Sequence, residues 1–471
     1  MKTFICIPCL LTGGTEIQTL NTVHALVQGA HEVTVACYFE HTPYMVERYR
    51  KAGAKVLLFS PEGTRVGGYR AIPYLYKHLR RTIKEVRPDV THVQYMAPGA
   101  MVILLLWLLG VRNIIATAHT AADIYKDLRL IHFLQRHCLR AFTCITERAE
   151  RSFFGSSQLY TTETVLGKRN HFTIYNALPA QMRCNVDANV DVDSLRDEDT
   201  QSVYDNVNEN NSQFTIDNSQ LTISSGAASL NPQPSSIDLN LSCQQDLDTN
   251  LDTFTHMQAC AALPDEDTQG VYENANVDEN YTHRSPLTAH RSTIGVVSRL
   301  ESIKGMDLVV PAFAEVLKRF PEVRLLVVGD GSLRAMMEQQ AAELGCADRI
   351  TWVGRQPQEE LAQWYGQMDI VLMPSRSEGF GLTAIEAMAN GCVMVASNVG
   401  GLPEVVRDGV CGLLHRTLDV QDMSAKVSEL LGDNELYSRL RTQALCEVEK
   451  YSFERYAKSI CNLYERLKVN G

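Results

Sequence analysis

The stretch DIVLMPSRSEGFGLTAIEAMANG, residues 369–391, has the pattern of a strand, a loop and a helix. The four residues after Asp369 are apolar and the run ends at Pro374, which predicts a short buried strand. After the loop, apolar side chains recur at helical spacing up to Gly391, a typical helix end. These side chains are Leu382, Ile385, Met388 and Ala389. A buried strand that leads through a glycine loop into a helix is the repeating unit of α/β folds.

The loop of this stretch carries groups suited to a sugar nucleotide. Gly379 and Gly381 leave backbone N–H groups accessible to an anion, and the positive end of the helix dipole adds to the attraction. Glu378 and Glu386 flank this anion site. Because a carboxylate repels phosphate, we expect the two side chains to accept hydrogen bonds from hydroxyl groups instead. A phosphate site between two hydroxyl sites fits a nucleoside diphosphate sugar.

The rest of the chain repeats the same alternation of strands and helices twice. Such alternation predicts two doubly wound, Rossmann-like domains with parallel sheets, facing a central cleft in which ligands bind at the carboxyl ends of strands. The strands expected in the first half are 4–8, 31–37, 55–59, 90–93 and 113–119. Those expected in the second half are 292–297, 323–328, 350–353, 369–373 and 393–396. Gly13, Gly14 and His119 lie at strand ends of the first half and are expected to face the cleft.

Charge and composition separate a third segment between these domains. Residues 184–280 contain 19 Asp and Glu against the single basic residue Arg196, whereas residues 1–182 contain 21 Lys and Arg against 12 Asp and Glu. The segment is rich in Asn, Asp, Ser, Gln and Thr and shows no sustained periodicity, which predicts a disordered insert. The predicted domains are therefore 1–182 for the acceptor, 183–288 as the acidic insert, and 289–471 for the donor. A last helix, about 452–468, is expected to pack back on the first domain.

Cysteine usage and hydropathy favour a cytoplasmic protein. The 13 cysteines stand at irregular spacings, which indicates reduced thiols. Cys6 and Cys9 form a CxxC pair, but no second pair lies nearby and the pair follows a strand, so neither a zinc site nor a redox site is favoured. No signal-peptide pattern precedes the first strand. The apolar run 101–109 is about half as long as a membrane span requires, which favours a core helix over a membrane-dipping one.

Three further loops of the second half supply cations and close backbone turns. Arg299 and Lys304 follow the strand 292–297 across a loop that turns at Gly305, and two cations at this spacing can bracket a diphosphate. Taken alone, an Arg and a Lys near a turn are more often solvated surface residues. Residues 329–332, Gly-Asp-Gly-Ser, form a turn from a strand into a helix, which could have Ser332 as its cap. Arg355 follows Gly354 at another strand end, where backbone groups could meet a nucleobase.

With these residues in place, the chain resembles the retaining family 4 glycosyltransferases (glycosyltransferase group 1) of GT-B fold. The resemblance rests on the E-x7-E spacing from Glu378 to Glu386 and covers residues 294–414 more closely than 1–177. It is supported by the motifs that contain Arg299, Lys304, Gly329, Val399–Glu404, Gly13–Glu16, Gly29–Val33 and His119. The family implies a hexosyltransferase that moves a sugar from a UDP- or GDP-sugar to a lipid-linked, saccharide or protein acceptor. Surface polysaccharide or glycolipid synthesis is the expected setting.

The resemblance also implies the role of each site residue. Arg299 and Lys304 would hold the donor diphosphate, Glu386 the ribose, and Glu378 the sugar or the reacting face. His119 would touch the transferred sugar. The other expected donor contacts are Gly13, Gly14, Gly329, Arg355, Gly381, Leu382 and Thr383. The cations and the helix dipole would stabilise the leaving phosphate without a metal or another cofactor. Retention then suits attack by the acceptor on the face that the phosphate leaves, and Glu378 as a covalent nucleophile is the less favoured route.

Two features leave alternatives open. Asn176 and Ala177 stand where the family often has Asn-Gly, and the insert lies beside this hinge, where it could limit closure of the domains. A weakly active or inactive sugar-nucleotide-binding protein, whose acidic insert recruits a partner, is therefore the alternative. The insert contains two related segments, 197–204 and 265–272, which indicate a duplication or a short partner motif used twice. The basic helix around 77–84 is expected either to attract anionic lipids or to be a solvated helix face, and nucleic-acid binding is not favoured.

Overall fold

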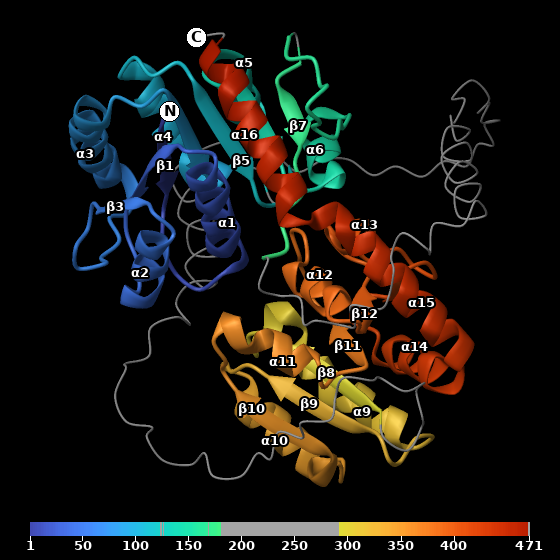
Figure 1. Ribbon diagram of the computed structural model, residues 1–471. Coiled ribbons are helices and arrows are strands. Elements are labelled where there is room, and N and C mark those ends of the chain that lie inside the picture. The colour runs from blue at the N-terminus through green and yellow to red at the C-terminus, as the bar shows by residue number, and fades with distance from the viewer. Residues whose placement is uncertain (123–124, 126, 168, 180–291, 470–471) are drawn as a thin grey trace, which may run out of the picture. The chain divides into compact units, whose positions relative to one another are not determined.

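The computed structural model of the protein describes residues 1–122, 125, 127–167, 169–179 and 292–469 (Figure 1). The predictions made for the insert at 183–288, including its two related segments, lie outside these residues. In the described part of the chain, two parallel sheets are present, one of seven strands and one of six. Helices connect the strands of each sheet, as expected for right-handed β-α-β units. The α/β class with two Rossmann-like domains is thus confirmed.

The first sheet has the strand order β3-β2-β1-β4-β5-β6-β7. Its strands are β1 (Lys2–Ile7), β2 (Glu32–Cys37), β3 (Lys55–Leu58), β4 (Val90–Gln94), β5 (Ile114–Ala118), β6 (Ala141–Cys144) and β7 (His171–Thr173). Its helices are α1 (Gly14–Gln28), α2 (Pro43–Lys51), α3 (Ala71–Val86), α4 (Met96–Leu108), α5 (Arg129–His137) and α6 (Glu147–Phe154). The direction of winding reverses between β1 and β4, and ligands bind at such a switch. The loop after β1 leads to Gly13, and β5, the neighbour of β4, leads to His119.

The second sheet repeats this order as β10-β9-β8-β11-β12-β13. Its strands are β8 (Thr293–Val297), β9 (Arg324–Val328), β10 (Ile350–Gly354), β11 (Ile370–Met373), β12 (Val393–Ser397) and β13 (Gly412–His415). Its helices are α9 (Val309–Leu317), α10 (Arg334–Glu343), α11 (Leu361–Tyr365), α12 (Leu382–Ala389), α13 (Leu402–Val405), α14 (Val420–Gly432) and α15 (Asn434–Glu447). The switch lies between β8 and β11, so the loops that carry Arg299 and Glu378 emerge side by side.

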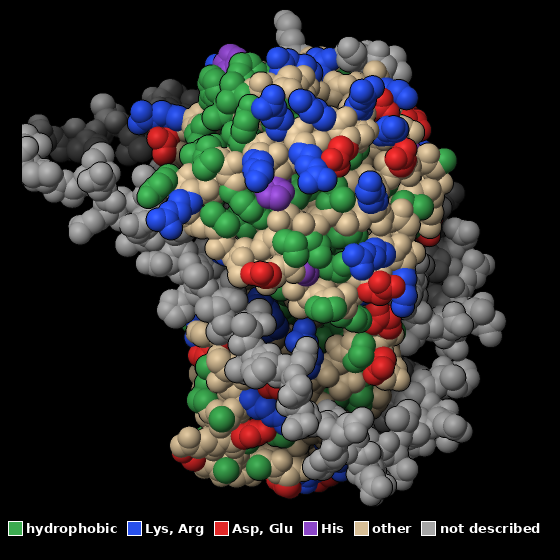
Figure 2. Space-filling view, turned by 90° about the vertical axis from the view of Figure 1, so that its left-hand side faces the viewer, with side chains coloured by type: hydrophobic (Ala, Val, Ile, Leu, Met, Phe, Trp, Pro, Cys, Tyr) green, Lys and Arg blue, Asp and Glu red, His purple; other side chains and the backbone are tan. Residues whose placement is uncertain are grey.

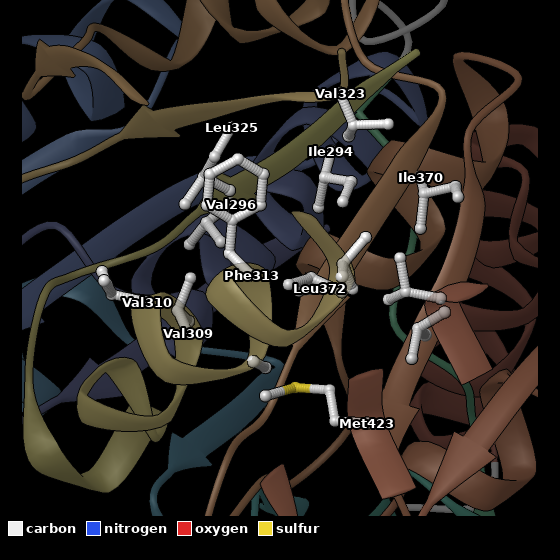
Figure 3. Close-up of a cluster of buried hydrophobic side chains, with 14 of the residues drawn as sticks. Ile294, Val296, Val309, Val310, Phe313, Val323, Leu325, Ile370, Leu372 and Met423 are labelled. Atoms are coloured by element: carbon white, nitrogen blue, oxygen red, sulfur yellow. The ribbon is translucent and has the colours of Figure 1, made fainter. Parts of the chain in front are cut away.

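Apolar side chains from strands and helices hold the second sheet together. Figure 3 shows Val296, Leu325 and Leu372 of three neighbouring strands directed at α9, from which Phe313 projects toward them. Met423 of α14 lies at the edge of the same cluster. Burying one such side chain stabilises the fold by about 1.5–3 kcal/mol. The strands that bear the site loops therefore stand on a closely packed and rigid base.

The last helix, α16 (Phe453–Val469), returns to the first sheet and packs against α1 (Figure 1). Its inner face buries Tyr456, Leu463 and Tyr464 among residues of β1 and α1. The Tyr456 hydroxyl is 2.6 Å from the Thr22 Oγ1, and the Tyr464 hydroxyl is 2.6 Å from Nδ1 of the buried His92. The C-terminal end of the chain thus completes the N-terminal half.

The segment that leaves the first sheet is fixed by polar contacts near Ala177. Its N–H donates to the Gln18 Oε1 over 2.9 Å, and its carbonyl accepts from the Asn21 Nδ2 over 3.1 Å. Leu178 N–H donates to the carbonyl of Tyr451 over 2.8 Å. Alanine at the position where the family often has glycine is accommodated in this setting. Both partners on α1 belong to the helix that begins at Gly14.

The apolar run 101–109 forms most of α4, and its burial is one-sided. Val102, Ile103 and Leu106 are buried in the core, as expected, whereas Leu108 is 63% exposed. The expected core helix therefore also contributes an apolar strip to the surface. None of the helices in the described part of the chain combines the length and the apolar composition needed to cross a bilayer.

Candidate donor-binding site

The loop between β11 and α12 is held in place by three glycine contacts. Gly401 N–H donates to the carbonyl of Glu378 over 3.0 Å, and Gly400 has a left-handed φ of +59°. A Cβ atom at Gly400 would overlap the carbonyl oxygen of Glu378. Gly305, with φ of +70°, packs in the same way against the carbonyl of Pro374. Side chains at these positions would displace the loop, so the glycines set its position.

Within this loop, Glu378 forms an ion pair with Lys304. The Lys304 Nζ donates to the Glu378 Oε2 over 2.8 Å, and 23% and 15% of the two side chains are exposed. Lys304 ends the short 3-10 turn η5 (Ser302–Lys304) after β8. Two residues that the sequence assigned to diphosphate and sugar are therefore brought into direct contact. Partial burial fixes both head groups at one place while leaving them open to a ligand.

Arg299 follows β8 on a loop that packs against the turn after β9. Leu300 N–H donates to the carbonyl of Asp330 over 2.9 Å, and a Cβ atom at Gly329 would overlap the carbonyl oxygen of Ser298. Gly329 has φ of +136°, and its N–H donates to the carbonyl of Gly354. The contribution of Gly329 that can be seen here is thus to support the Arg299 loop. The Arg299 side chain itself is exposed.

The cap expected at Ser332 is replaced by a different contact. Its hydroxyl donates to the Glu301 Oε2 over 2.6 Å, and its N–H donates to the Glu301 Oε1 over 3.0 Å. The helix α10 begins later, at Arg334. The pairing ties the turn after β9 to the loop after β8, which again supports the position of Arg299.

Glu386 lies on the inner face of α12 and is almost completely buried. Its Oε2 accepts from the Tyr365 hydroxyl over 3.0 Å, and its Oε1 accepts from the Gln358 Nε2 over 3.4 Å. Burial raises the pKa of the Glu386 carboxyl from its ordinary value to about 7, although both hydrogen bonds oppose the rise. A buried carboxylate with unused lone pairs is suited to accept hydrogen bonds from the hydroxyl groups of a ligand.

The N-terminus of α12 faces the glycine loop of the N-terminal half. Gly381, with φ of +104°, precedes the helix, and Leu382 and Thr383 form its first turn. A Cβ atom at Gly14 would lie 3.4 Å from the Leu382 Cδ1. The N–H of Ala384 donates to the carbonyl of Gly381, whereas those of Leu382 and Thr383 precede the first intrahelical bond and can meet an anion here. Gly14 allows the two loops to approach without a side chain between them.

Arg355 also contacts the glycine loop, next to Gly13. The Arg355 Nη2 donates to the Thr12 Oγ1 over 3.3 Å, next to Gly13 at the start of α1. The carboxylate of Glu16 occupies the space that a side chain at Gly13 would need. Burial raises the pKa of Glu16, which accepts from the Tyr95 hydroxyl over 3.0 Å, and nearby Arg299 opposes the rise. The expected residues Gly13, Gly14, Arg299 and Arg355 thus come together.

His119 lies at the end of β5 as a neutral, buried side chain. Its Nε2 is 2.8 Å from the Gln94 Oε1, so this nitrogen carries the proton and donates to the amide oxygen. Burial lowers the pKa of His119 to about 3. The carbonyl of His119 contacts Gly379, where a side chain would collide with it. The histidine is both a satisfied core residue and a neighbour of the Glu378 loop.

The CxxC pair of the sequence, Cys6 and Cys9, is buried. Burial raises the pKa of the Cys6 thiol to about 12, and the Cys9 Sγ donates to the Glu16 Oε1 over 3.1 Å. Protonated buried thiols are poor nucleophiles and poor metal ligands. Among the described residues, no group of three or more His, Cys, Asp or Glu side chains is placed to hold a metal ion.

Tyr365, Gln358 and Arg48 are site residues that the sequence did not suggest. Tyr365 and Gln358 contact Glu386, and the Arg48 Nη1 on α2 donates to the Gln358 Oε1 over 3.2 Å. Gln358 begins the 3-10 turn η8 (Gln358–Glu360), and Arg48 stands among charged residues of an ordinary surface helix. Polar residues in such short turns and helices carry no recognisable spacing, so folding alone reveals their positions.

Comparison with protein families gives two matches. Residues 278–445 match the model of glycosyl transferases group 1, and residues 12–159 match that of glycosyltransferase family 4. A D-inositol 3-phosphate glycosyltransferase of Nocardia farcinica is 38% identical over 178 residues, 36% of this chain and 40% of that protein. The enzyme of the same name from Mycobacteroides abscessus is 42% identical over 150 residues, 31% of this chain and 33% of that protein. The chain thus spans less than half of the length of these curated relatives.

Solved structures resemble the whole chain. Anabaena Alr3699/HepE in complex with UDP has a TM-score of 0.64 at 15% identity and covers 99% of this chain and 100% of its own. A glycosyltransferase from Rickettsia africae has a TM-score of 0.63 at 15% identity, covering 100% and 99%. Sucrose-phosphate synthase from Thermosynechococcus elongatus has a TM-score of 0.62 at 16% identity, covering 100% of both chains. At these identities the likeness shows the fold, in which two Rossmann-like domains form the GT-B architecture.

Proposed function

Because this chain belongs to the family 4, group 1 glycosyltransferases, we propose that it transfers a hexose-type sugar from a nucleoside diphosphate to an acceptor, with retention of configuration. The observation that carries the proposal is the group around β11 and α12. It combines the buried acceptor Glu386, the Lys304–Glu378 ion pair 2.8 Å long, and the N–H groups of Leu382 and Thr383 at the start of α12. This set provides separate positions for hydroxyl groups and for phosphates on one rigid strand–loop–helix unit.

The donor is bound with its diphosphate between Arg299, Lys304 and the first turn of α12. A guanidinium can hold two phosphate oxygens at once, and an ammonium adds a compact charge. The ribose hydroxyls donate to Glu386, which keeps free lone pairs beside Tyr365 and Gln358. The complexes of HepE with UDP and with UDP-glucose favour a UDP-sugar, and a GDP-sugar is the other candidate.

Charge development in the reaction explains why Lys304 and Glu378 are paired. As the sugar–phosphate bond breaks, negative charge grows on the leaving phosphate and positive charge on the anomeric carbon. Lys304 moves its hydrogen bond from Glu378 to the diphosphate, and this releases the Glu378 carboxylate to the sugar hydroxyls. With Arg299, the two cations stabilise the leaving group without a metal ion. The acceptor hydroxyl then attacks on the face that the phosphate leaves, which retains configuration.

His119 assists from the N-terminal half as a neutral hydrogen-bonding group. Because its Nε2 donates to the Gln94 Oε1, its Nδ1 is an acceptor for a sugar hydroxyl. A neutral imidazole places no positive charge near the developing cation at the anomeric carbon. This fits the pKa of about 3, since the side chain stays uncharged throughout the neutral pH range.

For the acceptor, we propose a lipid-linked or saccharide molecule presented at an anionic membrane. The named relatives are D-inositol 3-phosphate glycosyltransferases, so a small phosphorylated polyol is the main competing acceptor. Use of the product in surface polysaccharide or glycolipid synthesis, and a location on the cytoplasmic face of the membrane, stay predictions from the sequence. The identity of the acceptor distinguishes between these settings.

The surface formed by α3, α4 and α5 supports membrane attachment. These helices pack side by side, and we call their outer surface the α3–α5 face. Its exposed apolar side chains are Tyr69, Ile72, Tyr76, Met101, Leu108, Leu130 and Phe133. Its exposed basic side chains are Arg70, Lys77, Arg80, Arg81, Lys84, Arg112, Arg129 and Arg136. Figure 2, viewed from the side that carries α3, shows hydrophobic side chains interspersed with Lys and Arg. Such a mixture binds the interface of anionic bilayers.

A transfer assay tests the enzymatic proposal. The purified chain is incubated in EDTA with radiolabelled UDP-, GDP- and ADP-sugars, and with inositol phosphate, oligosaccharides or a lipid extract as acceptor. The proposal predicts a labelled product with the anomeric configuration of the donor. Tight donor binding without transfer to any acceptor would support the alternative, a sugar-nucleotide-binding protein that is weakly active or inactive and recruits a partner.

A vesicle assay tests the membrane proposal separately. The chain should float with phosphatidylglycerol vesicles and not with phosphatidylcholine vesicles. The double variant Lys77→Glu/Arg80→Glu should lower this binding by about tenfold or more, since each basic residue near the surface contributes about 1 kcal/mol. The matched variant Arg319→Glu/Arg324→Glu, in the C-terminal half, should bind as the native chain does. Equal loss in both variants would contradict attachment through the α3–α5 face.

A further inference from the structure

The buried carboxylate of Glu386 is connected to the N-terminal half through one side chain, Gln358. The Gln358 Nε2 donates to the Glu386 Oε1 over 3.4 Å, and the Gln358 Oε1 accepts from the Arg48 Nη1 over 3.2 Å. The amide therefore lies between a carboxylate and a guanidinium. A turned amide would place its NH2 group against the cation and its oxygen against the anion. Arg48 thus fixes which end of Gln358 faces Glu386.

Arg48 is well placed to hold the amide because it is itself held on both sides. Only 13% of its side chain is exposed, and its Nη2 is 3.2 Å from the Glu359 Oε1. Glu359 also accepts from the Tyr44 hydroxyl over 2.9 Å, and the guanidinium lies 5.6 Å from the centre of the Tyr44 ring. We call this set of four residues, Tyr44, Arg48, Gln358 and Glu359, the α2–η8 clasp. Each of its polar contacts joins α2 to η8.

The helix that carries Arg48 is rigidly mounted beside the glycine loop. Pro43 opens α2, and the Thr42 Oγ1 caps it by accepting from Met45 N–H over 3.3 Å. The buried Tyr49 hydroxyl donates to the carbonyl of Glu16 over 2.6 Å. Glu16 lies in the first turn of α1, next to Gly14. The position of α2 is therefore tied to the position of the loop that faces the donor.

We propose that Arg48 is a positioning residue for nucleotide binding, which acts through Gln358 to orient the ribose-binding carboxylate of Glu386. The inference rests on the proposed function, since it takes Glu386 as the ribose acceptor. With Gln358 oriented by Arg48 and Tyr365 on the other oxygen, the remaining lone pairs of Glu386 point in fixed directions. Arg48 then contributes to the affinity for the nucleotide without touching it.

Calorimetric titration of the full chain with UDP, GDP and ADP tests the proposal. Arg48→Met keeps the aliphatic stem and removes the guanidinium, and it should weaken binding of the nucleotide about five- to tenfold. Arg48→Lys, which keeps a positively charged donor group, should recover most of that loss. Arg50→Met is the matched control, because Arg50 is an exposed residue of the same helix, and it should bind as the native chain does.

A double-mutant cycle tests whether Arg48 affects nucleotide binding through Gln358. Gln358→Ala should weaken binding as much as Arg48→Met, and the double variant should be no weaker than either, because both remove the same orientation of Glu386. In steady state, the loss should appear in KM for the donor more than in kcat. The proposal would be overturned if the two losses of nucleotide affinity multiply in the double variant. It would also be overturned if Arg48→Met binds the nucleotide as tightly as the native chain does. If the native chain binds neither UDP, GDP nor ADP, the proposed function itself fails.

Discussion

The two sheets have the same strand order, and in each a loop after the central strand leads to the site. After β8 this loop presents Lys304 and the exposed cation Arg299, and the neighbouring loop after β11 presents Glu378. After β1 it presents Gly13 and Gly14, without side chains, backed by buried polar groups whose pKa values are shifted by burial. Under the proposed function, one half would supply charge to the donor, and the other would supply shape and neutral hydrogen bonds. Substitutions should then affect the two halves differently.

The largest effect should follow from removal of the exposed cation of the C-terminal half. Arg299→Ala should lower kcat/KM about 10²–10³-fold, because it deletes a group that stabilises charge in the transition state. Arg324→Ala, an exposed arginine of the same sheet, should retain native activity. The measurement is steady-state transfer with the best donor. A loss of less than about threefold would mean that Arg299 is a solvated surface residue.

A second large effect should follow from a side chain at Gly400. Because φ is +59° and a Cβ atom would overlap the Glu378 carbonyl, Gly400→Ala must displace the loop between β11 and α12. Activity should fall at least about tenfold, and stability by about 1–3 kcal/mol. Gly409→Ala is the control, since Gly409 also has positive φ, +69°, but open space around it. If both variants lose activity equally, backbone strain and not the Glu378 contact is responsible.

A smaller effect concerns the pH dependence of nucleotide affinity. The pKa of Glu386 is about 7 in the folded chain, so its carboxylate forms as the pH rises through that value. Affinity for the nucleotide should rise about tenfold between pH 6 and 8, beyond the titration of the nucleotide itself. Glu386→Gln should show only the titration of the nucleotide. Identical pH profiles for the two proteins would contradict a ribose role for Glu386.

The raised pKa of Glu386 has the opposite effect on folding stability, which should fall as the pH rises. Between the ordinary pKa of 4.5 and about 7, the folded chain keeps a proton on Glu386 that the unfolded chain has lost. The contribution of Glu386 to stability therefore decreases as the pH rises through this window and is constant above it. In urea unfolding, the difference in stability between Glu386→Gln and the native chain should change in this window alone.

The smallest effect on activity is expected from the buried polar groups of the N-terminal half. Tyr464→Phe removes the hydrogen bond between its hydroxyl and the buried His92, and it should destabilise the chain by about 1–3 kcal/mol. Transfer activity at moderate temperature should stay near the native value. Tyr69→Phe, at a position 78% exposed, should leave stability unchanged. A strong loss of kcat in Tyr464→Phe would give this half a more direct part in the reaction.

The sequence predicted most of the C-terminal half because its signals are local. Strand, glycine loop and helix follow each other within the stretch that contains Glu378 and Glu386, so spacing predicted these elements, while the roles of the two glutamates came from the family resemblance. The short strands β6, β7 and β13 were not predicted, because three or four residues such as His171–Thr173 carry little periodicity. The contacts of Glu386 with Tyr365 and Gln358 could not be predicted either, since they depend on the packing of α11 and η8 beside α12. Long-range contacts of single polar residues leave no pattern in the chain.

The central claim is that the C-terminal half binds the nucleoside diphosphate of the donor through its cations and Glu386. Calorimetric titration of the full chain with UDP, GDP and ADP in EDTA tests it most directly. One of the three should bind, and Glu386→Ala should weaken that nucleotide at least about tenfold, as expected when hydrogen bonds to a charged group are lost. Equal affinity of Glu386→Ala and the native chain, or no binding of any of the three nucleotides to the native chain, would contradict the claim.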